Sequence, residues 1–433
     1  MRGTVPPGEY PRPGYAWFVV AILIGTAILS YTDRQVLSLL VDPVRRDLGI
    51  SDTDISYLFG PAFALVYGVA GIPFGLLADR TSRRRLILAG VVVWSLGTVA
   101  CGYAHSFAQL FAARIVVGLG ESVLSPAAIS LISDYFAPSR RGLAVGCYLS
   151  GIAIGSGVAI LIGGGALHLV QSGALAGTML AAIAPWRLVL LVIGVPGLAW
   201  SLLLLLVREP ERQGARLPAE AATGGQRWVA LRRVAPIYAI VATASLVDNA
   251  VGAWAPTLLI RSFGLDAARV GLELGVLLTV GFGGGVLAGG WLADRVGASG
   301  GPGRKLAVCL AVALLILPVA WAMTLPQLAV VMGAVPLYFA LSGMVTACGF
   351  SAILDSVPAQ QRGLAMAVSF FLNVALGASL GPTLVAYASE QVFGAARGYG
   401  PAIALVAAGG FALVATVAAL DMSRRIPAVA TGT

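Results

Sequence analysis

Charged residues are scarce in this chain. Only 11% of its 433 residues are Asp, Glu, Lys or Arg, whereas 58% are hydrophobic. Soluble domains carry about 25% charged residues, so the composition excludes a soluble protein and indicates one embedded in a membrane. The apolar runs are continuous rather than alternating, which argues against a β-barrel and favours membrane-spanning helices.

Residues that serve metal, redox and catalytic chemistry are few as well. The four cysteines stand far apart inside apolar runs, and the two histidines form no ligand set. We interpret the cysteines as small buried hydrophobic residues. The sequence has no nucleophile elbow, Walker loop or dinucleotide fingerprint. We therefore expect no metal, no cofactor, no enzyme activity and no ATP-driven pump.

Twelve apolar runs are readable, each near the roughly 20 residues that cross a bilayer as a helix. They lie near residues 15–40, 54–78, 86–105, 108–133, 142–168, 186–207, 232–260, 267–293, 305–324, 327–354, 363–388 and 399–421. The longest polar stretch follows the sixth run. We therefore predict an N-terminal six-helix half (1–207), a cytoplasmic linker (208–231) and a C-terminal six-helix half (232–433) with a short cytoplasmic tail.

The net charge of +9 reflects topology rather than a nucleic-acid partner. With an even number of spans, most Lys and Arg residues fall on one side of the membrane, which is the bias that keeps basic loops in the cytoplasm. We expect a multi-pass protein of the inner cell membrane with both termini cytoplasmic. Nothing in the sequence calls for more than a monomer.

An internal repeat relates the two halves. The segment from Gly75 to Arg80 returns from Gly290 to Arg295, and the segment that starts at Asp134 returns at Asp355. Parallel repeats of this kind place a substrate site near the middle of the membrane, between the halves. The pattern predicts an all-α transporter with twelve transmembrane helices in two pseudo-symmetric halves.

Two motifs resemble signatures of the major facilitator superfamily. One follows the second span and reads Gly75-x-x-x-Asp79-Arg80-x-Ser82-Arg83-Arg84, with serine where that pattern usually has glycine. The other is the run from Arg114 to Gly120. In the second half the loop keeps Gly290, Asp294 and Arg295, but its basic end is displaced to Arg304 and Lys305.

A narrower resemblance is to the Spinster family of lysolipid and sphingolipid transporters. It rests on Tyr31-Thr32-Asp33-Arg34, Gly118-Leu119-Gly120-Glu121-Ser122, Val207-Arg208-Glu209-Pro210 and Trp254-Ala255-Pro256. The resemblance implies a carrier of lysophospholipids or sphingosine-1-phosphate-like amphiphiles. Anion:proton symporters of the same superfamily also carry an Asp-Arg pair in the first span and a Glu in the fourth, so the substrate stays open.

Charges inside the spans are the candidate functional residues. Each costs about 2.5–3.5 kcal/mol at the bilayer centre on insertion scales and is retained where it faces a partner or a wet cavity. Arg114 and Glu121 lie seven residues apart, about 10 Å along one helix face. They are too far apart to pair directly, so we expect Asp33 or Arg34 from the first span to lie between them.

We hypothesise that Asp33 and Glu121 carry protons. Burial in a cavity raises the pKa of a carboxyl group, and a neighbouring arginine lowers it. If opening the cavity to one side of the membrane changes which effect dominates, the group binds or releases a proton. Arg34, Arg114, Asp248 and Asn249 would form the substrate-headgroup or coupling network. The alternative is a permanent ion-pair network that only fixes the first span against the fourth.

The second half has lost most of these charges. By the repeat offsets, Arg34 corresponds to Asn249, Glu121 to Ser342 and Arg114 to Val335. Only the acid at Asp33 is kept, as Asp248. Asp248 is either a substrate contact or a helix-end residue. One polar half and one nearly apolar half suit an amphiphile, with the headgroup on the first and the acyl chain on the second.

The cytoplasmic loops supply candidate gate residues, which would pair when that side of the transporter is shut. The alternative is that their arginines anchor the loops to anionic lipid. The candidates are Gly75, Asp79, Arg80, Arg83, Arg84, Asp134, Asp294 and Arg295.

We therefore expect a proton-coupled secondary transporter of a small lysolipid-like or sphingolipid-like amphiphile, working by alternating access. The alternatives are an organic-anion:proton symporter or drug exporter of the same superfamily. From another class, a non-transporting lipid receptor or a scramblase is also open.

Overall fold

The computed structural model describes residues 10–78, 80–173, 183–212, 224–357, 362–394 and 398–425. Every described element is a helix. Within these described ranges, eleven helical spans are long and apolar enough to cross a membrane, and a shorter apolar helix, Gly157–Gln171, lies where the fifth run was predicted. The predicted all-α membrane architecture is therefore confirmed.

By its internal contacts the chain divides into two compact units. The first comprises Met1–Pro218 and Leu265–Val276, and the second comprises Ala219–Gly264 and Leu277–Thr433. The first boundary falls within the predicted linker, of which residues 213–223 lie outside the described ranges. The predicted domain bounds stay a prediction.

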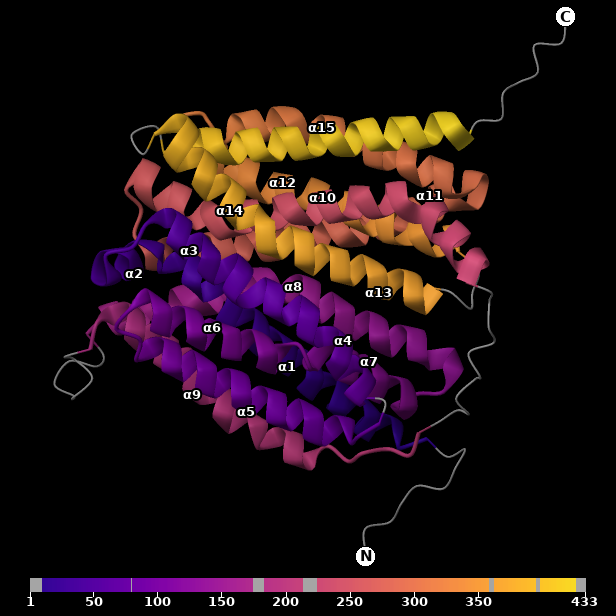
Figure 1. Cartoon of the computed structure of the whole chain (residues 1–433), viewed down its shortest axis with the longest axis horizontal. Coiled ribbons are helices and arrows are strands. Elements are labelled where there is room, and N and C mark those ends of the chain that lie inside the picture. The colour runs from indigo at the N-terminus through magenta and orange to yellow at the C-terminus, as the bar shows by residue number, and fades with distance from the viewer. Residues whose placement is uncertain are drawn as a thin grey trace, which may run out of the picture. The chain divides into compact units, whose positions relative to one another are not determined.

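The first unit runs from indigo to magenta in Figure 1. It contains α1 (Pro13–Leu39), α2 (Val41–Leu48), α3 (Asp52–Phe59), the π-helix η1 (Gly60–Leu65), α4 (Val66–Ala78), α5 (Arg83–Gly102), α6 (Phe107–Glu121), α7 (Leu124–Tyr135), α8 (Pro138–Gln171), α9 (Pro185–Ser201) and the 3-10 helix η3 (Leu203–Leu206). Within it α1 packs on α8, and α5 packs on α6 and α9.

The second unit contains α10 (Gly224–Phe263), α11 (Ala267–Ala322), α12 (Leu328–Ser356), α13 (Arg362–Leu372), the π-helix η5 (Asn373–Ala378), α14 (Ser379–Tyr387), the π-helix η6 (Ala388–Phe393) and α15 (Tyr399–Arg425). The first turns of α11 belong to the first unit. Helix α11 holds two predicted spans, Ala267–Gly297 and Pro302–Ala322. Helix α10 packs on α12, α14 and α15.

Local sequence explains the breaks that shape the first unit. Ser51 caps α3 in a capping box with Asp54, which satisfies two helix-end N–H groups. Pro61 then lies inside η1. Because proline lacks an N–H, it interrupts the regular helical hydrogen bonding and favours the wider π-turn. This turn carries Phe63, which lies at the candidate site described below.

Helices α5 and α6 approach each other very closely beside that site. A Cβ added at Gly90 would lie 2.7 Å from the carbonyl oxygen of Gly120. Small residues let membrane helices pack at this distance. The contact places Glu121, the last residue of α6, against the other helices of the first unit rather than toward lipid, and Glu121 is fully buried.

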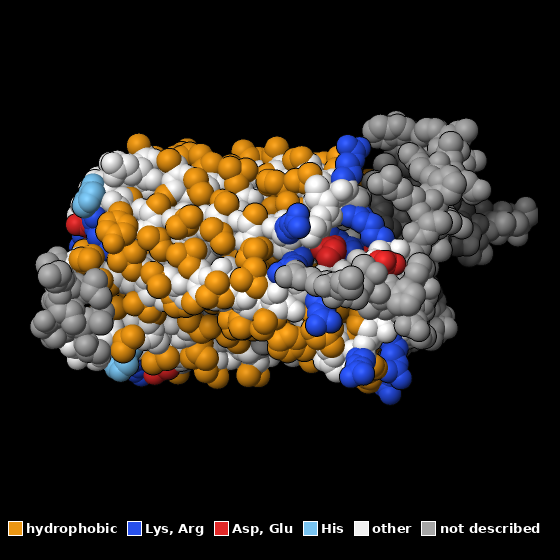
Figure 2. Space-filling model, turned by 90° about the horizontal axis from the view of Figure 1, so that it is seen from below, with side chains coloured by type: hydrophobic (Ala, Val, Ile, Leu, Met, Phe, Trp, Pro, Cys, Tyr) orange, Lys and Arg blue, Asp and Glu red, His pale blue; other side chains and the backbone are white. Residues whose placement is uncertain are grey.

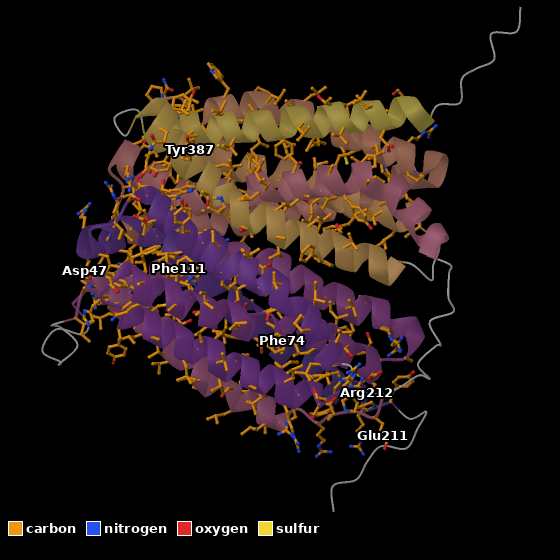
Figure 3. All side chains as sticks on the ribbon, in the orientation of Figure 1. Asp47, Phe74, Phe111, Glu211, Arg212 and Tyr387 are labelled. Carbon is orange, nitrogen blue, oxygen red and sulfur yellow. The ribbon has the colours of Figure 1, made fainter. Side chains whose placement is uncertain are left out.

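On the face shown in Figure 2, hydrophobic side chains form a broad band and Lys and Arg side chains gather beyond one end of it. Such a band suits contact with lipid, and basic residues at one edge suit the membrane–water boundary. In the first unit Asp47 and Arg212 lie at opposite ends of the helices (Figure 3). Asp47 accepts hydrogen bonds from Arg187 at 2.8 Å and Trp186 at 3.1 Å. The guanidinium of Arg187, with Trp186, holds the pKa of Asp47 below its ordinary value.

Candidate functional site

A buried ion pair joins α1 to α6 inside the first unit. The Nε of Arg34 donates to Oε2 of Glu121 at 2.6 Å. The hydroxyl of Ser30, one turn earlier on α1, donates to the same oxygen at 2.6 Å. The Glu121 side chain has no exposed surface, whereas 20% of the Arg34 side chain is exposed. Arg34 is therefore the member of the pair that an entering molecule can reach.

Three aromatic rings surround the Arg34 guanidinium. Its central carbon lies 4.9 Å from the ring centroid of Tyr31, 4.8 Å from that of Phe63 and 4.4 Å from that of Tyr67. Aromatic faces attract cations, most strongly where water is excluded. The rings hold the planar guanidinium in place. Its N–H groups donate to Glu121 and Ser30.

Arg114 binds the backbone of α1 and α3 rather than a carboxylate. Its Nη1 donates to the carbonyl oxygen of Asp33 at 3.2 Å, and its Nε donates to that of Leu58 at 3.3 Å. Its guanidinium also lies 4.9 Å from the ring centroid of Phe63. Phe63 thus contacts the guanidinium groups of both Arg34 and Arg114. Of the two candidates from α1, it is Arg34 that pairs with Glu121.

Two carboxylate oxygens at this site have no hydrogen-bond partner among the described residues. They are Oδ1 of Asp33 and Oε1 of Glu121, and both are buried. A buried polar atom without a partner costs about 1–3 kcal/mol. Each oxygen is therefore a place where a proton, or a donor group of a bound molecule, would bind favourably.

The second unit holds one of the predicted residues in a different setting. Asp248 lies in the middle of the α10 span, so it is not a helix-end residue. Its Oδ1 accepts hydrogen bonds from the hydroxyl of Tyr338 at 2.8 Å and from that of Ser342 at 2.6 Å. The amide of Asn249 donates instead to the carbonyl oxygen of Ser245 at 2.8 Å.

The predicted gate residues come together only in part. Arg83 donates to Asp134, to Glu209 at 2.8 Å and to the Ser130 carbonyl at 3.2 Å. The side chain of Arg84 donates to the carbonyl oxygens of Leu204 and Leu205 in helix η3. All of these contacts lie within the first unit.

The other predicted gate residues are not part of this cluster. Arg80, Asp294 and Arg295 are exposed, and Arg295 lies over the ring of Trp291. Gly75 lies in α4, where an added Cβ would lie 3.8 Å from the side chain of Pro126 of α7. Asp79 lies outside the described residues.

Comparison with known proteins shows the family to which the chain belongs. The family model "Major Facilitator Superfamily" matches residues 23–382. This chain belongs to the major facilitator superfamily. It is therefore a multi-pass membrane transporter and not an enzyme, as the sequence predicted.

Relatives in the superfamily differ in what they carry. The chain is 30% identical over 389 residues to an MFS-type efflux pump of Mycolicibacterium smegmatis, covering 88% of this chain and 86% of the pump. It is 28% identical over 344 residues to a probable L-galactonate transporter of Escherichia coli, covering 76% of this chain and 71% of that transporter.

A solved structure matches the fold closely. It is the crystal structure of a bacterial homolog of the human lysosomal transporter Spinster, in an inward-facing and unoccupied conformation. The TM-score is 0.79, with 25% identity over 95% of this chain and 97% of that chain. The resemblance to the Spinster family is confirmed.

The superfamily's two-fold repeat extends to a charge cluster that the sequence analysis missed. In the second unit Lys305 donates to Ser351 at 2.7 Å and to Asp355 at 2.6 Å. These residues repeat Arg83, Ser130 and Asp134. The offset of 221 residues that relates Asp134 to Asp355 also relates Ser130 to Ser351, so the signal was present in the sequence.

Glu209 is a further residue that was not predicted as part of a site. It accepts hydrogen bonds from Ser82, from the side chain of Arg83 and from the backbone N–H of Arg84. Burial raises the pKa of Glu209, but these hydrogen bonds and the charge of Arg83 outweigh it, so the pKa lies below its ordinary value. Ser82 also accepts from the backbone N–H of Arg85 as the cap of α5, a role that glycine does not fill as well.

Proposed function

We propose that this chain is a proton-coupled secondary transporter that moves a lysolipid-like or sphingolipid-like amphiphile by alternating access. The observation that carries the proposal is the buried pair of Arg34 and Glu121, with a second acid, Asp33, directly beside Arg34 in α1. The likeness to a bacterial Spinster homolog over 95% of the chain supports the substrate class.

The coupling step follows from competition for one guanidinium. Arg34 is partly exposed and Glu121 is enclosed, so an anionic headgroup reaches Arg34 first. Phosphate and carboxylate groups bind guanidinium through two parallel hydrogen bonds. When the headgroup takes these donors, Glu121 loses its counter-charge and takes up a proton, because a bare buried carboxylate is costly. Departure of the headgroup restores the pair and releases the proton.

Asp33 and Arg114 complete the network in this proposal. The enclosed Oδ1 of Asp33 has no partner among the described atoms, which makes Asp33 the second proton carrier. Arg114 ties the backbone of Asp33 to that of Leu58. It keeps this turn of α1 fixed while Arg34 exchanges partners.

Carriage of a small organic anion is the second candidate. Arg34 pairs with the carboxylate of Glu121, and sugar acids carry the same group. The relationship to a probable L-galactonate transporter also supports this candidate. The similarity to an efflux pump supports drug export as a further alternative. A lipid receptor or a scramblase would need neither the titratable groups nor a proton gradient.

We further propose that the protein lies in the inner cell membrane with both termini in the cytoplasm and works as a monomer. Its partners are the amphiphile, protons and membrane lipid, with no cofactor and no nucleic acid. The excess of basic residues on one side of the predicted topology supports this orientation.

Reconstitution into liposomes with an imposed pH gradient tests the function. Lysophospholipids, sphingoid phosphates and sugar acids are offered separately to wild type, Asp33→Asn, Glu121→Gln and the control Glu273→Gln. Glu273 is an exposed acid paired with Arg269 on α11. We expect gradient-driven uptake of the amphiphiles by wild type and the control only. Net transfer of lipid without a gradient, unchanged in both site variants, would refute coupling and indicate a scramblase.

A further inference from the structure

Asp248 is an acid of the second unit with one oxygen engaged and one available. Oδ1 accepts from both Tyr338 and Ser342. Oδ2 has no hydrogen-bond partner among the described residues, and it is not one of the fully enclosed atoms. The residue is partly exposed, whereas Asp33 and Glu121 are buried. Asp248 can therefore meet a bound molecule directly.

Within the second unit, no described basic residue forms an ion pair with Asp248. In the second unit Lys305 pairs with Asp355, and Arg295 lies over Trp291. Arg261 lies over Tyr399, and its place on α10 is 13 residues from Asp248, or about 20 Å of helix. The repeat explains the difference from the first unit, because the position after the acid is Asn249 instead of an arginine.

Aromatic rings line the same part of α10. Tyr338 makes edge-to-face contacts with Phe339 and Phe411, and Phe339 makes one with Phe282 of α11. One turn beyond Asp248, a Cβ added at Gly252 would lie 3.7 Å from the ring of Phe339. Aromatic faces attract ammonium groups and favour alkylated ones. A carboxylate without a counter-charge, beside several rings, has the chemistry of a site for an organic cation.

We propose that Asp248, with Tyr338 and Ser342, is a subsite for an organic ammonium group of the substrate. The inference rests on the proposed carriage of amphiphiles and narrows it to those that bear an amine or a quaternary ammonium. The two hydroxyl groups stabilise the ionised carboxylate and fix its orientation, and the ammonium group supplies the missing positive charge.

Binding to the purified full chain in nanodiscs tests this subsite. The probes are tetrapropylammonium ion, lysophosphatidylcholine and lysophosphatidate, which lacks the ammonium group. The proteins are wild type, Asp248→Asn, Tyr338→Phe and the control Glu273→Gln. We expect Asp248→Asn to weaken the binding of both ammonium probes by about tenfold or more and to change the binding of lysophosphatidate by less than about twofold. Tyr338→Phe should bind the ammonium probes with an affinity between those of wild type and Asp248→Asn. A further variant, Asp248→Glu, should bind them more tightly than Asp248→Asn does.

The outcomes separate this inference from the proposed function. An equal loss for all three probes, or no loss for the ammonium probes, overturns the subsite. Loss of proton-driven transport with ammonium binding intact would make Asp248 a proton site and also overturns it. If wild type binds neither lysolipid but binds tetrapropylammonium in an Asp248-dependent way, the lipid proposal fails and the subsite stands.

Discussion

The Nε of Arg34 lies 2.6 Å from Oε2 of Glu121, so the C-terminal part of α1 is tied to the end of α6 by a charged hydrogen bond. The carboxylate end of this bond is fully buried. Removing one member of a buried pair leaves an uncompensated charge, whereas removing both can be nearly neutral. The pair can therefore be tested by stability as well as by transport.

We predict that Arg34→Gln destabilises the protein by about 3 kcal/mol and that the double variant Arg34→Gln with Glu121→Gln recovers most of this loss. Thermal unfolding of the purified protein in one detergent measures both effects. If the two single losses simply add in the double variant, the two side chains do not act as a pair.

A second prediction concerns Phe63, whose ring contacts the guanidinium groups of both Arg34 and Arg114. Phe63→Leu keeps an apolar side chain and removes the π-face, so it should weaken binding of an anionic amphiphile by about two- to thirtyfold, the equivalent of roughly 0.5–2 kcal/mol. Phe74→Leu on α4 (Figure 3) is the matched control. Equal effects of the two changes would show that the ring of Phe63 has no special role.

The third prediction is a pH dependence. The folded protein holds the pKa of Glu209 below its ordinary value of 4.5, so the ionised carboxylate stabilises the fold above that pH. This contribution is lost as pH falls through the lower folded pKa. Thermal unfolding should show Glu209→Gln less stable than wild type at about pH 7 and the difference shrinking below about pH 4.5.

Asp47 has a lowered pKa as well, so the comparison needs a background that lacks it. Introduced into the Asp47→Asn protein, the Glu209→Gln change should lower stability with the same pH profile. A loss of stability that stays constant down to about pH 3, below the ordinary pKa of a glutamate, would mean that the charge of Glu209 does not stabilise the fold.

The fourth prediction compares the two copies of the repeated cluster. Arg83 donates to Asp134, Glu209 and the backbone of Ser130 and Pro210 through several nitrogens. Lys305 reaches its two partners through one nitrogen. Lysine cannot reproduce the guanidinium fork, so Arg83→Lys should lower stability by about 1–3 kcal/mol. Lys305→Arg should cost less, and the reverse order in thermal unfolding would contradict this assignment.

The sequence was sufficient for the fold because apolar runs of membrane length are a strong signal. It also indicated that Arg114 and Glu121 need a group between them. Whether Asp33 or Arg34 pairs with Glu121 depends on how α1 is rotated, and that rotation is set by packing on α8, a helix far away in the chain. Such long-range packing cannot be read from spacing.

The cluster around Lys305 shows a different limit. In the sequence a glycine-rich insertion displaces the basic end of the second loop to Arg304 and Lys305, and the spacing alone does not say which partners these residues reach. In the structure the helical turns of α11 continue through the insertion, and Lys305 reaches Ser351 and Asp355. Glu209 was visible only as part of a motif, and its contacts with Arg83 and Arg84 require the folded loop.

The most direct test of the coupling proposal compares substrate exchange with gradient-driven accumulation for Glu121→Gln in liposomes. Exchange of labelled for unlabelled lysolipid needs no net proton movement, whereas accumulation against a gradient does. We predict that Glu121→Gln keeps exchange within about threefold of wild type, because the neutral side chain mimics the protonated acid, and loses accumulation. Accumulation at the wild-type level in this variant would contradict the account.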